Sequence, residues 1–156
     1  MTTVQHSPTG GRLHRLLVCF DGSAESKQAI GLAVELGKRL AAEITVLCVL
    51  PDTTHLETSG GASAAEKAAK DRLTTSLAPI KLRAVADAVK FTEVSVSGGD
   101  PADRIAAYAD EHGFDLVVIG SHGQERATHG GLGRVVERLV RDPHFPVLIV
   151  PDSARS

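Results

Sequence analysis

Three glycines with a regular spacing stand in one short segment, residues 120–133. The segment reads Gly120, two residues, Gly123, nine residues, Gly133, and it joins an apolar run to a helix-like stretch, GRVVERLV. Glycine lets the backbone approach a bound group closely and adopts torsion angles that other residues avoid. A helix that starts after the last glycine adds free N–H groups and the positive end of its dipole. The spacing therefore predicts a phosphate-binding site, and a flexible surface loop is the alternative interpretation.

An arginine, Arg134, follows the last of these glycines. Its guanidinium could bind a phosphate through two parallel hydrogen bonds and supply part of the charge that a metal ion would bring. Its long side chain could instead fill the site, or turn outward to Glu137 or Glu125. An exposed ion pair of that kind contributes only about 0–1 kcal/mol. The sequence leaves both interpretations open.

The same segment shows little that predicts catalysis or metal binding. His122 and His129 flank the loop with a spacing that is not typical of a metal site, so we expect surface histidines. Ser121 follows an apolar run, but no base for it can be identified. The chain contains neither G-x-S-x-G nor the two common phosphate motifs, G-x-x-x-x-G-K-[ST] and G-x-G-x-x-G after the first strand. A dedicated enzyme is not expected.

The composition excludes several classes of protein. Lys and Arg number 17 against 19 Asp and Glu in 156 residues, and aromatic residues make up 3%. Nucleic acid and anionic membranes are therefore not expected as partners. The first residues lack the apolar core of a secretory signal and no apolar run approaches membrane length, so a cytoplasmic location is expected. Cys19 and Cys48 lie in strand-like runs and are interpreted as small buried residues rather than reactive thiols.

The elements that must position the glycines alternate between strand and helix. Apolar, strand-length runs are found at 15–20, 43–50, 91–97, 115–120 and 147–150. Helical periodicity is found at about 24–42, at 99–113, and from the glycine segment to about 141. Residues 52–66 are expected to be a loop that runs into an Ala-rich helix, with a kink or restart at Pro79 and an end at about 88. Ser23 and Asp100 are expected as N-caps, Pro101 in a first turn, and Gly113 at a helix exit.

This alternation predicts an α/β, Rossmann-like, doubly wound parallel sheet with helices on both faces. Such sheets bind ligands outside the carboxyl ends of their strands. That edge should carry both the glycine segment and the turn after the first strand, FDGS. Asp21 in this turn is expected either to bind a ligand or to close the turn, since aspartate is common in both places.

Three stretches resemble the universal stress protein family: LLVCFDGSAESKQAIGLAVELGKRLAAEITVLCVL, DLVVIGSHG and GLGRVVERLVRDPHFPVLIV. The likeness covers about residues 14 to 151 and keeps the family's order. The resemblance implies a five-stranded sheet in the order 3-2-1-4-5 and a homodimer often built on the last strand. In the family's nucleotide-binding branch the glycine motif is G-x-x-G, nine residues, then G followed by Ser or Thr.

The resemblance carries nucleotide-binding positions onto this chain. Asp21 matches an acidic residue near the nucleotide, and Val49 matches a position that borders adenine through its backbone. Arg134 stands where nucleotide binders place a small hydroxyl, and Val136 stands where many carry a second one. The full set of predicted site residues is Cys19, Phe20, Asp21, Val49, Ile119, Gly120, Gly123, Gly133, Arg134 and Val135.

The resulting expectation is a cytoplasmic, dimeric stress protein that binds ATP or a related adenine nucleotide, with or without Mg²⁺, as a regulator. The alternatives are a stress protein that acts only through protein–protein contacts, and a slow ATPase of the related adenine nucleotide hydrolase-like fold. A single domain is expected at 13–151 between tails at 1–12 and 152–156. The edge strand Val147, Leu148, Ile149 and Val150 is expected to form the dimer, unless the short polar tail covers it.

Overall fold

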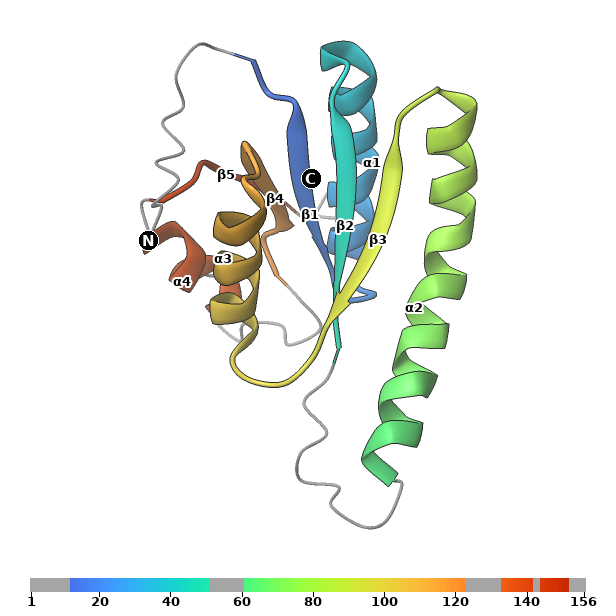
Figure 1. The fold of residues 1–156 in the computed structure, drawn as a ribbon, viewed down its shortest axis with the longest axis vertical. Coiled ribbons are helices and arrows are strands. Elements are labelled where there is room, and N and C mark those ends of the chain that lie inside the picture. The colour runs from blue at the N-terminus through green and yellow to red at the C-terminus, as the bar shows by residue number, and fades with distance from the viewer. Residues whose placement is uncertain (1–11, 51–60, 123–132, 142–143, 152–156) are drawn as a thin grey trace.

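The computed structural model describes residues 12–50, 61–122, 133–141 and 144–151 of the chain. Strands and helices alternate along these residues, as the hydrophobic pattern predicts (Figure 1). The elements are β1 (Arg15–Phe20), α1 (Ala24–Leu40), β2 (Glu43–Val49), α2 (Gly61–Ala86), β3 (Phe91–Val96), α3 (Pro101–His112), β4 (Leu116–Gly120), α4 (Arg134–Arg141) and β5 (Val147–Val150).

The strands form one parallel sheet in the order β3-β2-β1-β4-β5, which confirms the predicted topology. The central strand β1 pairs on both sides, and its Leu17 lies opposite Thr45 of β2 and Val117 of β4. Strand order reverses at β1, because the chain moves outward to β2 and β3 on one side and then returns to β4 on the other. The carboxyl ends of β1 and β4 therefore lie side by side at the reversal point.

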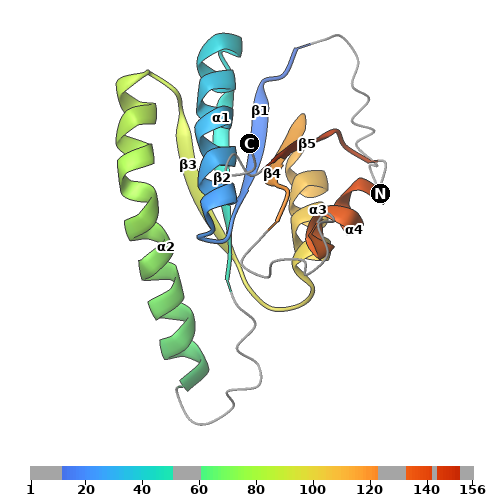
Figure 2. The same cartoon turned by 180° about the vertical axis from the view of Figure 1, so that it is seen from behind.

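Helices cover both faces of the sheet, and the side chains of successive strand residues pack into opposite cores. Leu16, Val18 and Phe20 of β1 pack into a core with α1 and α2, whereas Leu17 and Cys19 pack into a second core with α3 and α4. Figures 1 and 2 show these two layers from opposite sides. Within the described residues, no helix is both long and apolar enough to cross a membrane.

Capping residues begin and end the helices as expected. The Ser26 N–H donates to Ser23 Oγ at 3.2 Å at the start of α1. Asp100 Oδ1 accepts the N–H groups of Ala102 and Asp103 at the start of α3, and Pro101 occupies the first turn. Gly113 ends that helix with a φ of 65°, in the left-handed region where glycine carries no steric penalty. These caps place the helix ends within one or two residues of the predicted positions.

Helix α2 differs from the sequence-based expectation. It begins at Gly61, within the stretch 52–66 where a loop was expected to run into a helix, but it continues through Pro79 without a restart. Packing explains the continuity, since Leu77 on one side of the proline and Ala84 on the other are both fully buried against the sheet. The proline itself is exposed. Tertiary burial here outweighs the local cost of a missing backbone N–H.

Candidate functional site

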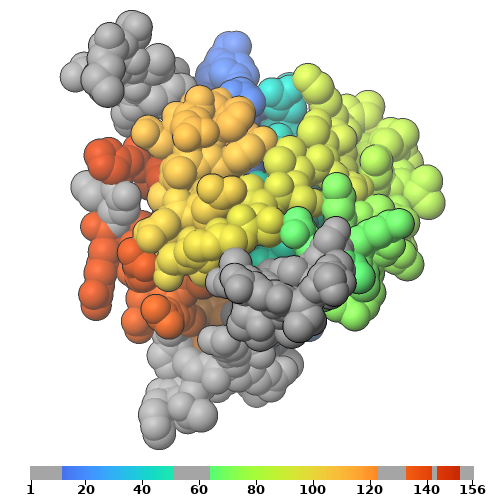
Figure 3. All heavy atoms as spheres, turned by 60° about the horizontal axis from the view of Figure 1, so that its bottom comes forward, coloured from blue at the N-terminus to red at the C-terminus, as the bar shows by residue number. Residues whose placement is uncertain are grey.

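A cleft of about 980 Å³ opens at the carboxyl ends of the strands, among α2, α3 and α4. Figure 3 turns this end of the molecule toward the viewer, with α2 in green, α3 in yellow to gold and α4 in red-orange. Every predicted site residue that the structure describes lines this cleft: Cys19, Phe20, Asp21, Val49, Ile119, Gly120, Gly133, Arg134 and Val135. Gly123 lies outside the described residues.

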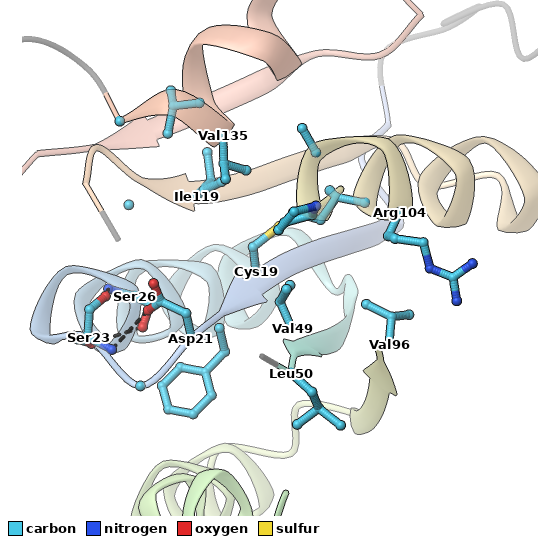
Figure 4. A pocket seen from close by; sticks show the side chains of 18 of the residues that line it. Cys19, Asp21, Ser23, Ser26, Val49, Leu50, Val96, Arg104, Ile119 and Val135 are labelled. Atoms are coloured by element: carbon cyan, nitrogen blue, oxygen red, sulfur yellow. Dashed lines mark hydrogen bonds between the residues drawn. The ribbon is translucent and has the colours of Figure 1, made fainter. Parts of the chain in front are cut away.

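The floor of the cleft is apolar. Cys19, Val49 and Ile119 project from the ends of β1, β2 and β4 toward the α3 and α4 side, where Val135 closes the floor (Figure 4). Phe20 points the other way, and its fully buried side chain belongs to the core beneath α1 and α2. An apolar floor of this kind suits a flat aromatic ring.

Asp21 closes the turn between β1 and α1. Its Oδ1 accepts the Ser23 N–H at 2.9 Å, the bond drawn in Figure 4. This is the side-chain turn that aspartate forms readily after a strand. The structure therefore shows the turn-making role, and a ligand-binding role for the same carboxylate stays a prediction.

Gly120 has a packing role at the end of β4. A Cβ at this position would lie 2.9 Å from Glu25 Cβ, 3.0 Å from Glu25 C and 3.2 Å from Glu25 O, in the first turn of α1. Real Cβ atoms essentially never come within 3.0 Å of another heavy atom, and the two backbone distances are also unusually short, so a larger residue would force α1 and the strand end to shift apart. The first glycine of the predicted phosphate motif thus serves the fold, whether or not a ligand binds.

Backbone hydrogen bonds join the two sides of the glycine segment. The Ser121 N–H donates to Val150 O at 2.9 Å, and the Gly133 N–H donates to Ser121 O at 2.8 Å. The Gly133 amide is therefore already bonded to Ser121, the residue that follows β4, and is not available to a ligand. The first helical bond runs from the Glu137 N–H to Gly133 O, so the three amides between these two residues lack a partner inside α4. These amides belong to Arg134, Val135 and Val136.

Arg134 does not fill the cleft. Its side chain is 82% exposed, and its Nη2 lies 3.9 Å from Asp100 Oδ2 at the start of α3. The acidic residue that it approaches is thus Asp100 rather than Glu137, and Glu125 lies outside the described residues. Arg138, one turn further along α4, lies closer to Asp100 Oδ2, at 3.0 Å, and pairs with Asp103 at 2.8 Å.

The family comparison agrees with this geometry. Residues 12–151 match the model of the universal stress protein family. The chain belongs to this family. Stress response protein NhaX of Bacillus subtilis is 30% identical over an alignment of 161 positions, which spans 87% of this chain and 96% of NhaX.

Solved universal stress proteins share the fold. UspA from Lactobacillus plantarum has a TM-score of 0.80 at 23% identity, over 90% of this chain and 99% of that one. A universal stress protein in complex with cAMP has a TM-score of 0.64 at 24% identity, over 90% and 98% of the two chains. An Archaeoglobus fulgidus universal stress protein in complex with dAMP has a TM-score of 0.62 at 19% identity, over 88% and 97%.

One side of the cleft of this universal stress protein was not predicted from the sequence. Ser97, Gly98 and Gly99 follow β3 at the same sheet edge, and both glycines have positive φ angles of 76° and 74°. Arg72 of α2 and Arg104 of α3 also line the cleft. The stretch GGD directly after the strand predicted at 91–97 was the available signal, since parallel strands end at one edge.

The two cysteines are buried and free, as predicted. Burial, together with the nearby charge of Asp21, raises the pKa of Cys19 to about 12. Burial and the charge of Glu93 raise the pKa of Cys48 to about 11, although Lys70 acts in the opposite direction. Both thiols therefore stay protonated near neutral pH, which makes them poor nucleophiles and metal ligands.

His122 lies at the cleft, where its Nδ1 is 3.1 Å from Ser121 Oγ. His129 lies outside the described residues. Across the part of the chain that the structure describes, no three His, Cys, Asp or Glu side chains come together in a group able to hold a metal ion.

Proposed function

We propose that this universal stress protein binds ATP or a related adenine nucleotide in the cleft and acts as a cytoplasmic, nucleotide-dependent stress-response regulator. One observation carries the proposal. A single cleft joins an apolar floor at the ends of β1, β2 and β4 to the amino end of α4 and to four arginines, Arg72, Arg104, Arg134 and Arg138. Its volume of about 980 Å³ suits a ligand of nucleotide size.

Base and phosphate would occupy different parts of this cleft. Adenine would lie over Cys19, Val49 and Ile119, because a flat ring covers apolar surface there without burying polar groups. The phosphates would lie at the first turn of α4, where backbone amides and the helix dipole favour an anion. Two universal stress proteins of the same fold are described as complexes with cAMP and dAMP, which are adenine nucleotides.

Arg134 and Val136 stand where nucleotide binders of the family carry hydroxyl side chains, and this difference changes how phosphate would be held. Val136 is 2% exposed and packs into the core beneath α3 and α4, so its side chain would offer nothing to a ligand. Arg134 is exposed at the cleft and long enough to turn inward, and its guanidinium would replace the hydroxyl with a charged donor. We therefore propose that Arg134 binds phosphate and that the dependence on Mg²⁺ is weak.

Calorimetric titration of ATP, ADP and AMP, with Mg²⁺ and with EDTA, tests this proposal. Wild type should bind with saturable heat, and Arg134→Ser should bind ATP more weakly. Arg141→Ser is the matched control, because it removes the same charge from the last residue of α4, about 10 Å away at 1.5 Å per residue. Tighter binding by Arg134→Ser would show that the arginine obstructs the site.

A second candidate function is regulation through protein contacts alone. It is favoured by the bond from the Gly133 N–H to Ser121 O and by the approach of Arg134 to Asp100, since both occupy groups that a phosphate would use. The absence of heat for all three nucleotides, with wild type and with Arg134→Ser, would support this candidate and contradict nucleotide binding.

We also propose that the protein forms a homodimer through β5. This strand is at an edge, and among the described residues only β4 pairs with it. The carbonyls of Pro146 and Val150 accept hydrogen bonds from the β4 side. Successive residues of a strand direct their backbone groups to opposite sides, so the N–H and C=O groups of Val147 and Ile149 point outward. Edge strands with open backbone groups pair readily with another chain.

Sedimentation of wild type and Ile149→Pro tests the dimer. The proline removes an outward N–H while the inward ladder stays intact. Wild type should sediment as a dimer and the variant as a monomer with an unchanged circular dichroism spectrum. A monomeric wild type would contradict the proposal.

A further inference from the structure

Asp100 stands between two arginines at the mouth of the cleft and is held in place by both of its oxygens. Oδ1 caps α3 by accepting the N–H groups of Ala102 and Asp103 at 3.0 and 3.3 Å. Oδ2 lies 3.0 Å from Arg138 Nη1 and 3.9 Å from Arg134 Nη2. The side chain is 26% exposed, so it is fixed on the cleft wall rather than free in solvent.

The surroundings of Asp100 keep it charged. Partial burial acts to raise its pKa, but the Asp103 and Ala102 amides and the guanidiniums of Arg138 and Arg134 outweigh this, so the pKa lies below its usual value. The carboxylate is therefore ionised at neutral pH. It places a permanent negative charge beside the guanidinium that we propose as a phosphate ligand.

The positive charge of α4 at the cleft is consequently offset. Arg138 pairs with both Asp100 and Asp103, and Arg134 shares Asp100 with it. What remains for a ligand at the amino end of α4 is the set of backbone amides that have no partner inside the helix, and the helix dipole, equivalent to roughly half a positive charge. The amino end of α4 can therefore neutralise a small anion but not a long, highly charged one.

We infer that Asp100 sets the phosphate-charge preference of the cleft, so that it takes adenosine monophosphates over the triphosphate. The inference rests on the proposed function and specifies its ligand class. A nucleoside triphosphate carries roughly two more negative charges than a monophosphate near neutral pH. A longer phosphate chain that reaches Arg134 also reaches Asp100 Oδ2, which repels it.

The experiment compares the dissociation constants of AMP and ATP in wild type and Asp100→Asn, by calorimetry in EDTA at low salt. Asparagine caps helices about as well as aspartate, so this change removes the charge and keeps the α3 N-cap. Asp110→Asn is the matched control, because it removes one charge from an exposed position of the same helix, about 15 Å along its axis.

We expect wild type to bind AMP more tightly than ATP. Asp100→Asn should shift the ratio of the two constants at least about fivefold toward ATP, and Asp110→Asn should leave it within about twofold, since the effect of a charge falls with distance and screening. The double variant Asp100→Asn/Arg134→Ser should lose most of the shift, because the gain arises from releasing Arg134. Thermal melts of each variant confirm folding.

Each outcome bears on a different claim. Binding of both nucleotides with a ratio that Asp100→Asn leaves unchanged would overturn the role of Asp100 and leave nucleotide binding standing. Tighter binding of ATP than AMP by wild type would overturn the monophosphate preference. No binding of either nucleotide by any folded variant would refute the proposed function itself, and the inference with it.

Discussion

Replacing Gly120 by alanine would test whether the first glycine of the motif is required by packing. The added methyl group would lie 2.9 to 3.2 Å from three atoms of Glu25, and two of these are backbone atoms. Glu25 and Ser26 are buried in the first turn of α1, so this turn cannot move aside without disturbing the sheet. Strand β4 and helix α1 must therefore separate by several tenths of an ångström.

The magnitude follows from two opposing effects. Overpacking of this kind costs about 1–3 kcal/mol, and the reduced entropy of the unfolded chain returns about 0.4–1 kcal/mol. We expect the free energy of unfolding to fall by about 1–2 kcal/mol, which corresponds to a melting temperature lower by about 2–8 °C. The assay is urea unfolding without nucleotide, followed by far-ultraviolet circular dichroism because the chain has no tryptophan.

Gly31→Ala is the control within the same pair of elements. Nothing lies within 4 Å of a Cβ at Gly31, which is exposed inside α1, so alanine should stabilise the protein by about 0.5–1 kcal/mol. If Gly120→Ala proved as stable as wild type, or gained stability as Gly31→Ala should, the packing explanation for Gly120 would be refuted.

Three further changes test the cap, a core position and the buried thiol. Ser23→Ala should lower the free energy of unfolding by about 1 kcal/mol in urea titration, because Ser26 N–H loses its acceptor, and Ser23→Asn should restore most of it. Leu77→Ala should cost about 2–5 kcal/mol at this fully buried site, against less than about 0.5 kcal/mol for Leu82→Ala, which is 72% exposed. Cys19 should resist Ellman's reagent at pH 8 until the protein unfolds. The pKa of Cys19 is about 12 in the folded protein and 9.0 for a free thiol, so the unfolded protein loses this proton at lower pH. The free energy of unfolding should therefore fall between pH 9 and 12, and it should fall less steeply in Cys19→Ala.

The parts of the fold that depend on neighbouring residues could be predicted from the sequence. Ser23, Asp100 and Gly113 act through bonds to residues within a turn of themselves, so their roles follow from local spacing. The apolar strand runs likewise predict a buried parallel sheet. The position of the cleft then follows, because parallel strands end at one edge.

The parts that depend on distant contacts could not be predicted. Gly120 is required by the first turn of α1, and Arg134 approaches Asp100 of α3, and no spacing along the chain shows either contact. The use of the Gly133 amide by Ser121 is a third example. Helix α2 passes through Pro79 for the same reason, since burial of Leu77 against the sheet is a tertiary effect.

The most direct test of the central claim is a nuclear magnetic resonance titration of ¹⁵N-labelled protein with AMP. If the cleft binds an adenine nucleotide with its phosphate at α4, the amides of Arg134, Val135 and Val136 should shift in a saturable way, together with that of Val49 beside the base. Saturable shifts confined to other elements, or no saturable shift at millimolar AMP, ADP and ATP, would contradict the account.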